Sequence, residues 1–213
     1  MTAIIRLSGV SKKFRTGSVL EDVDLEVLEG ERLAVTGANG TGKSVLLRLM
    51  CRLLAPDSGT VFIDDRFQSP RKSFPQEFGI VIDRPGFQAL RTGFENLQEL
   101  ARIRRKIGDR EIRSAMDQVG LDSGLRQRVG QYSLGMKQKL ALAQAIMENQ
   151  QVLLLDEPFN ALDEESAVRV RALLLKLSEQ GRTIVFCSHN PEDLDEVATR
   201  RLAIVNSRVV KSD

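Results

Sequence analysis

One loop of the chain has the residue types and the spacing needed to hold phosphate groups. Residues 37–44 read GANGTGKS and fit the pattern G-x-x-x-x-G-K-[ST]. Glycines let a loop curl tightly, so that backbone N–H groups and the positive end of the next helix face one anion. The lysine adds a compact charge for the β- and γ-phosphates, and the serine hydroxyl can bind Mg²⁺. The pattern therefore predicts a nucleoside triphosphate site. Its candidate residues are Gly37, Asn39, Gly40, Thr41, Gly42, Lys43, Ser44 and Val45.

Two acidic residues follow an apolar run in the stretch VLLLDEP. Asp156 can bind Mg²⁺ directly or through water, and Glu157 can polarise an attacking water as a general base. Two acids that merely end a strand in solvent are the common alternative. A phosphate loop in the same chain favours the catalytic interpretation, because Mg-phosphate chemistry needs a carboxylate.

The stretch TIVFCSH repeats this layout, an apolar run that ends in polar residues. It contains His189, the only histidine in the chain. A lone histidine is more often structural than catalytic. The carboxyl ends of parallel strands meet at the edge of a sheet where ligands bind, so we expect His189 to contact the γ-phosphate there.

The elements around these stretches predict an α/β fold. VLLL and TIVF are continuous apolar runs, which are typical of central strands in a parallel sheet. Residues 43–54, 134–148 and 163–180 show helical spacing, and residues 23–35 predict two strands with a turn at Gly30. Strands that alternate with helices indicate a mostly parallel sheet covered on both faces. From Phe94 to Gly120 apolar residues recur at helical intervals, so this part is predicted to be a helical insertion.

Composition excludes several classes of protein. The net charge of +2 is too balanced for bulk electrostatic binding to nucleic acid. Cys51 and Cys187 have no metal-ligand spacing and are interpreted as thiols in a reducing cytosol. No apolar run approaches the ~20 residues of a membrane helix, and the first residues lack the pattern of a signal peptide. If the protein works at a membrane, another chain must cross it.

These stretches, in this order, resemble the nucleotide-binding subunit of ATP-binding cassette transporters over nearly the whole chain. GANGTGKS is similar to Walker A, VLLLDEP to Walker B, NALD at residues 160–163 to the D-loop, and SHN carries the switch histidine. The resemblance implies an ATP hydrolase that uses Mg²⁺ on a P-loop NTPase fold with an antiparallel β edge. Residues 1–83 and 150–213 would form a RecA-like core with an N-terminal β part, and 84–149 a helical subdomain.

YSLGMKQ, at residues 132–138, resembles a variant of the family signature LSGGQ. The resemblance implies that two subunits meet head to tail, and that the signature of one caps the γ-phosphate held by the partner's Lys43. The residues implied in this cap are Ser133, Gly135 and Met136. Leu134 replaces a glycine and Met136 a glutamine. A simple role for Ser133 as the N-cap of a helix is the alternative.

Two further positions carry roles that only the resemblance implies. Phe14 falls where the family places an aromatic that stacks on adenine, and a core residue is the alternative. Asp83 stands where the Q-loop usually has glutamine, after the stretch FGIVI. A carboxylate there can reach Mg²⁺, directly or through water, but it adds a negative charge.

The resemblance also implies partners and a location. We expect a second copy or a paralogue, an integral membrane permease, and a cytoplasmic position on the inner face of the cell membrane. The signature variant resembles that of exporters for drugs and peptide antibiotics, which favours export. A non-transport ATPase of the same family, which drives a membrane or cell-envelope complex, is the alternative. A small-molecule kinase is disfavoured because no acceptor site is evident. The basic residues 101–107 fit a solvated helix face better than a lipid or permease contact.

Overall fold

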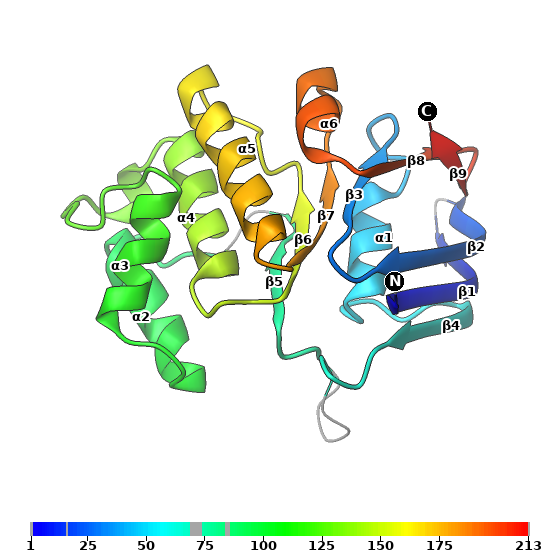
Figure 1. The fold of residues 1–213 in the computed structure, drawn as a ribbon, viewed down its shortest axis with the longest axis horizontal. Coiled ribbons are helices and arrows are strands. Elements are labelled where there is room, and N and C mark those ends of the chain that lie inside the picture. Colours follow the sequence, from blue (N-terminus) through cyan, green and yellow to red (C-terminus); the bar gives the residue numbers. More distant parts are fainter. Residues whose placement is uncertain (1, 16, 69–73, 84–85, 213) are drawn as a thin grey trace.

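The computed structural model describes residues 2–15, 17–68, 74–83 and 86–212. Over these ranges the strands form two sheets (Figure 1). An antiparallel sheet has the order β2-β1-β4, and a larger sheet has the order β5-β6-β7-β3-β8-β9. In the larger sheet the strands are parallel except β9, which runs antiparallel to β8 at one edge. The strands are β1 (Ala3–Phe14), β2 (Gly17–Leu28), β3 (Arg32–Thr36), β4 (Ser58–Ile63), β5 (Phe78–Val81), β6 (Val152–Asp156), β7 (Thr183–Cys187), β8 (Arg200–Val205) and β9 (Arg208–Ser212).

Helices cover both faces of the larger sheet. Figure 1 shows α2 and α3 at one end of the molecule, the antiparallel sheet at the other, and the larger sheet between them. The fourth helix, α4, packs against both α3 and β5, and so joins the helical end to the sheet. The helices are α1 (Lys43–Met50), α2 (Gly93–Arg104), α3 (Asp109–Gln118), α4 (Leu134–Ile146), α5 (Glu164–Glu179) and α6 (Pro191–Val197). A short 3-10 helix spans Val129–Gln131.

The central strands bury alternate side chains in two different hydrophobic cores. In β6, Leu153 and Leu155 belong to the core beneath α4 and α5, whereas Val152 and Leu154 belong to the core shared by α1 and the antiparallel sheet. All four side chains have 0% exposure. Burial on both faces explains why this strand is apolar without interruption.

Most predicted elements are confirmed, including the mostly parallel sheet and the antiparallel edge. The strands predicted on either side of Gly30 form, but they lie in different sheets and do not pair as a hairpin. The helix after the phosphate loop ends at Met50 and not at residue 54. The predicted division at residue 84 lies outside the described residues and stays a prediction. None of the helices that the structure describes is both long and apolar enough to cross a bilayer.

Polar side chains cap the N-termini of α4 and α5, the helices on either side of β6 in the chain. Ser133 accepts a hydrogen bond from Met136 N at the start of α4, and Asp163 accepts one from Ser166 N at the start of α5. These bonds satisfy helix N–H groups that have no partner within the helix. At α1 the N-cap residue is Gly42, which has no side chain to cap the first turn. The N-terminal N–H groups of α1 therefore remain available for another acceptor.

Candidate functional site

The phosphate loop joins the carboxyl end of β3 to the first turn of α1. Gly37 and Gly42 have φ angles of 141° and 109°, in a region that residues with side chains rarely adopt. A Cβ atom on Gly42 would lie 2.7 Å from a methyl carbon of Val19, so the loop also packs too closely for a larger residue. The loop therefore directs the uncapped first turn of α1 at one small region, as anion binding requires.

Lys43 lies at the centre of this loop with only 7% of its surface exposed. Its Nζ atom donates hydrogen bonds to the carbonyl oxygens of Gly37 at 2.7 Å and Ala38 at 3.3 Å. The same atom lies 3.8 Å from a carboxylate oxygen of Glu157. The lysine is thus held between the phosphate loop and the acidic pair.

The three stretches that carry the candidate site residues meet because β6, β7 and β3 are neighbours in the sheet and parallel. Asp156 is the last residue of β6 and pairs in register with Cys187, the last residue of β7. Glu157 follows with a φ of 48°, and its Oε2 lies 3.1 Å from Nδ1 of His189. The structure therefore places the acidic pair, the histidine and Lys43 at one edge of the sheet.

A hollow of about 420 Å³ is lined by Lys43 and both acidic residues, whereas His189 lies outside its lining and contacts it only through Glu157. Its lining includes the phosphate loop, the start of α1, the acidic pair and the aromatic ring at the end of β1. The lining residues are Phe14, Val19, Asn39, Gly40, Gly42, Lys43, Ser44, Val45, Arg48, Asp156 and Glu157. Phe14 is 45% exposed, so the alternative interpretation of this residue as part of the core is wrong.

Asp83 lies close to this hollow, with its charge paired. Its carboxylate accepts a hydrogen bond from the guanidinium of Arg48, one of the residues that line the hollow. Asp83 has a φ of 62° and also lines a second hollow, of about 300 Å³, together with Asp156, Glu157 and Ala161. The carboxylate is therefore near the acidic pair, and Arg48 offsets the negative charge that it adds there.

The stretch YSLGMKQ, at residues 132–138, leads into α4 and packs against residues 160–163 of the same chain. Ser133 is exposed, and its hydroxyl accepts the 3.1 Å hydrogen bond from Met136 N, so it does have the N-cap role. A Cβ atom on Gly135 would lie 2.6 Å from the carbonyl oxygen of Ala161. The small size of Gly135 is thus needed within the chain. Leu134 is 58% exposed beside it.

A buried network lies behind the loop that carries His189. Arg171 on α5, Asp193 on α6 and Ser188 after β7 are each no more than 3% exposed. The Arg171 guanidinium donates to Asp193 at 3.0 Å, and the Ser188 hydroxyl donates to the other Asp193 oxygen at 2.8 Å. Ser188 Oγ in turn accepts from Asn190 N at 3.2 Å. The network fixes the backbone on both sides of His189.

Sequence reasoning assigned no role to several of these residues. Gln138, within the signature stretch, donates hydrogen bonds to the carbonyl oxygens of Glu157 and Pro158. Gln138 lies three residues after Gly135, and residues three apart lie on one face of a helix. This spacing could have indicated that Gln138 faces the same segment as Gly135. Arg48 and Arg171 carried no comparable signal, since their partners are far away in the sequence.

The two cysteines and the basic residues at 101–107 have structural roles. Burial raises the pKa of Cys187 well above its usual value and that of Cys51 to about 11, so both thiols are protonated at neutral pH. Within residues 101–107, Arg102 contacts Glu99, and Arg104 and Lys106 both contact Glu77. This pairing agrees with a solvated helix face.

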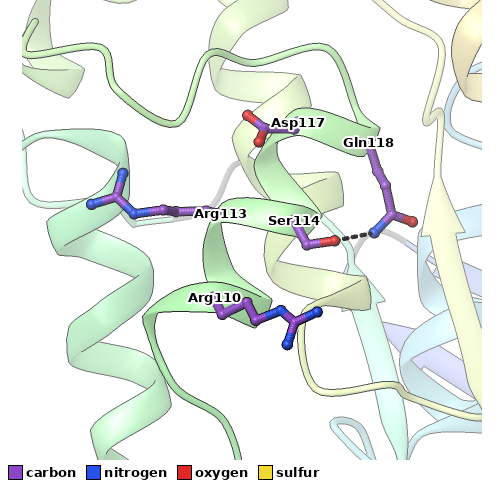
Figure 2. A pocket seen from close by; sticks show the side chains of 5 residues that line it. All are labelled: Arg110, Arg113, Ser114, Asp117 and Gln118. Atoms are coloured by element: carbon purple, nitrogen blue, oxygen red, sulfur yellow. Dashed lines mark hydrogen bonds between the residues drawn. The ribbon is translucent and has the colours of Figure 1, made fainter.

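A further hollow lies on the outer surface of α3, away from the sheet edge. It has a volume of about 700 Å³, and all of its lining residues come from this one helix. Figure 2 shows Arg110 and Arg113 pointing in different directions, and a hydrogen bond from Gln118 to Ser114 along the helix. Arg113 lies 4.2 Å from the centre of the Phe94 ring, which accounts for its orientation. The side chains do not converge on a common point.

Comparison with known proteins agrees with this geometry. The family model described as ABC transporter matches residues 20–160. The uncharacterised ABC transporter ATP-binding protein YybJ of Bacillus subtilis is 33% identical over 210 residues, which cover 99% of this chain and 96% of the relative. The bacitracin transport ATP-binding protein BcrA of Enterococcus faecalis is 34% identical, with coverage of 93% of this chain and 65% of BcrA. The dimeric structure of MJ0796, a bacterial ABC transporter cassette, matches with a TM-score of 0.86 and 26% identity, over 97% of each chain.

Proposed function

The chain belongs to the ABC transporter family, and we propose that it is the subunit that binds and hydrolyses ATP to drive a separate membrane permease. The observation that carries this proposal is the hollow that brings the phosphate loop, the acidic pair and Phe14 together. We propose that the exposed ring of Phe14, which lines this hollow, stacks on adenine, and that the uncapped first turn of α1 binds the phosphates.

Glu157 is the proposed general base of hydrolysis. It accepts a proton from a water molecule as the water oxygen bonds to the γ-phosphorus, and the bond from this phosphorus to the bridging oxygen breaks to release ADP. His189 orients the reacting groups through its contact with Glu157 at 3.1 Å. Lys43 stabilises the charge that develops on the phosphate oxygens.

Mg²⁺ fits the donor groups that line the hollow. Ser44 and Asp156 offer oxygen atoms, the ligands that this ion prefers, and the ATP phosphates would offer more. Among the residues that the structure describes, no cluster of three or more His, Cys, Asp or Glu side chains could hold a metal by itself. Bound Mg²⁺ offsets charge on the β- and γ-phosphate oxygens. Asp83 is a further proposed ligand, directly or through water.

The remaining parts of the proposal concern partners. Two cassettes meet head to tail, and Ser133, Gly135 and Met136 at the start of α4 cap the γ-phosphate held by Lys43 of the partner subunit. The dimeric form of the structural relative supports this arrangement. An integral permease holds the dimer at the inner face of the cell membrane. We propose export as the direction of transport, and this rests on the signature variant alone.

Glu157→Gln separates binding from chemistry and tests the proposal. The change keeps the size of the side chain and removes the base, so ATP hydrolysis should fall by about 10²–10⁴-fold. ATP binding, measured by titration calorimetry, should persist, and gel filtration with ATP should show more dimer. Glu165→Gln, on the exposed first turn of α5, is the matched control and should hydrolyse ATP at the normal rate. Normal turnover in Glu157→Gln would refute the assignment.

The permease is tested by purification from membranes. The chain should copurify with an integral membrane protein, which mass spectrometry identifies, and ATP should drive solute movement when both are placed in vesicles. Hydrolysis without solute movement would indicate the alternative, a family member that drives a membrane complex by force alone.

A further inference from the structure

The turn after β6 holds Glu157 in a conformation that side chains disfavour. Its φ of 48° lies in the left-handed region, where the Cβ atom crowds the backbone. The turn aims the carboxylate at Lys43, 3.8 Å away, and at His189, 3.1 Å away. Because this backbone conformation is unfavourable by itself, its surroundings must maintain it.

Gln138 on α4 provides two contacts that hold this turn. Its Nε2 atom lies 3.2 Å from the carbonyl oxygen of Glu157 and 3.1 Å from that of Pro158. Both partners are acceptors only, so the group that faces them must be the NH₂ with its two hydrogens. Each hydrogen can therefore serve one carbonyl, and the side chain clamps two consecutive peptide units.

A second contact fixes α4 against the same segment. The carbonyl oxygen of Ala161 would lie 2.6 Å from a Cβ on Gly135, one helical turn before Gln138. Asn160 N also donates to the Glu157 carbonyl at 3.2 Å, which closes the turn from within. The segment from Glu157 to Ala161 thus packs on one face of the signature helix, and Gln138 supplies its side-chain hydrogen bonds.

We propose that Gln138 is a positioning residue, which keeps the Glu157 carboxylate oriented for proton transfer by clamping the turn that carries it. This inference rests on the proposed role of Glu157 as the base. The proposed role gives Gln138 no contact with the nucleotide or with the attacking water. Its loss should therefore slow the chemical step and leave nucleotide affinity unchanged.

Gln138→Met tests the clamp, because methionine has nearly the same length and shape but no hydrogen to donate. We expect kcat for ATP hydrolysis to fall by about 10- to 100-fold, the effect of losing two hydrogen bonds that orient a reacting group. KM for ATP should change less than twofold. Gln138→Glu, which presents oxygens to the two carbonyls, should lower kcat at least as much. An unchanged kcat in both variants would overturn the proposal.

Gln144→Met is the matched control for damage to the helix. Gln144 lies on the same helix and is half-buried, but it lines a hollow next to β5 and α2. This variant should keep the normal kcat. An equal loss in Gln144→Met would overturn the proposal, because a weakened α4 would then explain both results.

A double mutant separates positioning from general structural support. In the Glu157→Gln background, Gln138→Met should cause no further loss of single-turnover hydrolysis, because the residue that it positions no longer acts as a base. A further 10- to 100-fold loss in this background would overturn the inference. Normal turnover in Glu157→Gln alone would instead refute the proposed function, so the two failures can be told apart.

Discussion

The Nδ1 atom of His189 lies 3.1 Å from Oε2 of Glu157, across the ends of the neighbouring strands β7 and β6. Only 21% of the Glu157 side chain is exposed, whereas 68% of the His189 side chain is exposed. The histidine therefore contacts the proposed base from a side that is open to solvent. We propose that its exposed ring also reaches the γ-phosphate when ATP is bound.

His189→Ala should slow hydrolysis more than it weakens binding. Removal of one preorganised hydrogen-bond donor from an oxyanion hole lowers the rate by about 10²–10³-fold, and we expect a loss of this order here. We expect the ATP dissociation constant to change by less than threefold, because Lys43 and the α1 turn remain in place. Steady-state hydrolysis and titration calorimetry measure the two effects. An unchanged hydrolysis rate would leave His189 with a structural role only.

Substitutions of Arg48 and Asp83 should shift the Mg²⁺ requirement in opposite directions. Asp83→Ala removes a carboxylate near the proposed Mg²⁺ site, so the Mg²⁺ concentration for half-maximal hydrolysis should rise about two- to fivefold, as for an exposed charge. Arg48→Met removes the cation that pairs with Asp83, and it should lower the Mg²⁺ concentration for half-maximal hydrolysis by a similar factor. Asp83→Gln should restore much of the activity. Titrations of Mg²⁺ at saturating ATP measure these shifts. If the Mg²⁺ concentration for half-maximal hydrolysis is the same in all three variants, Asp83 is not part of the proposed metal site.

Tandem-linked dimers test whether Ser133 serves the partner's nucleotide. Lys43→Ala and Ser133→Arg should each be inactive as homodimers, but a linked pair with one change in each half should regain one intact site. Wild type linked to Ser133→Arg shows whether one site can turn over. If this control hydrolyses ATP and the mixed pair does not, the head-to-tail assignment is wrong. Because Ser133 also caps α4, melting curves should accompany the assays; cap loss costs about 1 kcal/mol.

Asp193→Ala should lower the free energy of unfolding by about 3–5 kcal/mol, because it leaves the buried Arg171 charge without its buried partner. Glu164 is another partner of Arg171, but the Glu164 side chain is 74% exposed. Glu164→Gln should therefore lower the free energy of unfolding by less than about 1 kcal/mol. Urea unfolding compares the two. Similar losses would mean that the buried pair has no special importance.

At the start of α2, the Thr92 hydroxyl accepts a hydrogen bond from Glu95 N, and the Glu95 carboxylate accepts one from Thr92 N. This capping box predicts that the folding stability depends on pH in the acidic range. Hydrogen bonds from the backbone and then the side chain of Thr92 lower the pKa of Glu95 below its usual 4.5. A lowered pKa in the folded state means that the stabilisation is complete above pH 4.5 and is lost as the pH falls through the folded-state pKa. Glu95→Gln should therefore reduce the steepness of the stability loss below pH 4.5. Urea unfolding from pH 6 to 3 gives the free energy of unfolding as a function of pH for both proteins. If the Glu95 carboxylate makes no contribution, wild type and Glu95→Gln will show the same slope.

Local patterns in the sequence predicted the elements that position the site. The phosphate loop and the ends of β6 and β7 were recognised because their patterns, glycine spacing and unbroken apolar runs, each lie within a few consecutive residues. β1 was not recognised, because bulges shift its register at several points and break the alternation of apolar and polar residues. β9 is short and mostly exposed, so it has no clear pattern either.

Contacts between distant residues were beyond the same reasoning. Gln138 meets Glu157 only because α4 packs beside the end of β6, and Arg48 meets Asp83 across 35 positions of sequence. The buried Arg171 resembled an ordinary charged residue on a helix face. These partners depend on how the elements pack, which residue spacing does not reveal.

The alternation of β6 side chains between two hydrophobic cores links the stability of the two halves of the molecule. If either core separated from the larger sheet, one face of β6 and β7 would enter water while the other face stayed buried. The shared strands therefore favour one cooperative unfolding transition. Amide hydrogens in β6 and β7 should then exchange with solvent only through global opening, so the strands that lead to Asp156 and Glu157 should be among the most slowly exchanging parts of the chain.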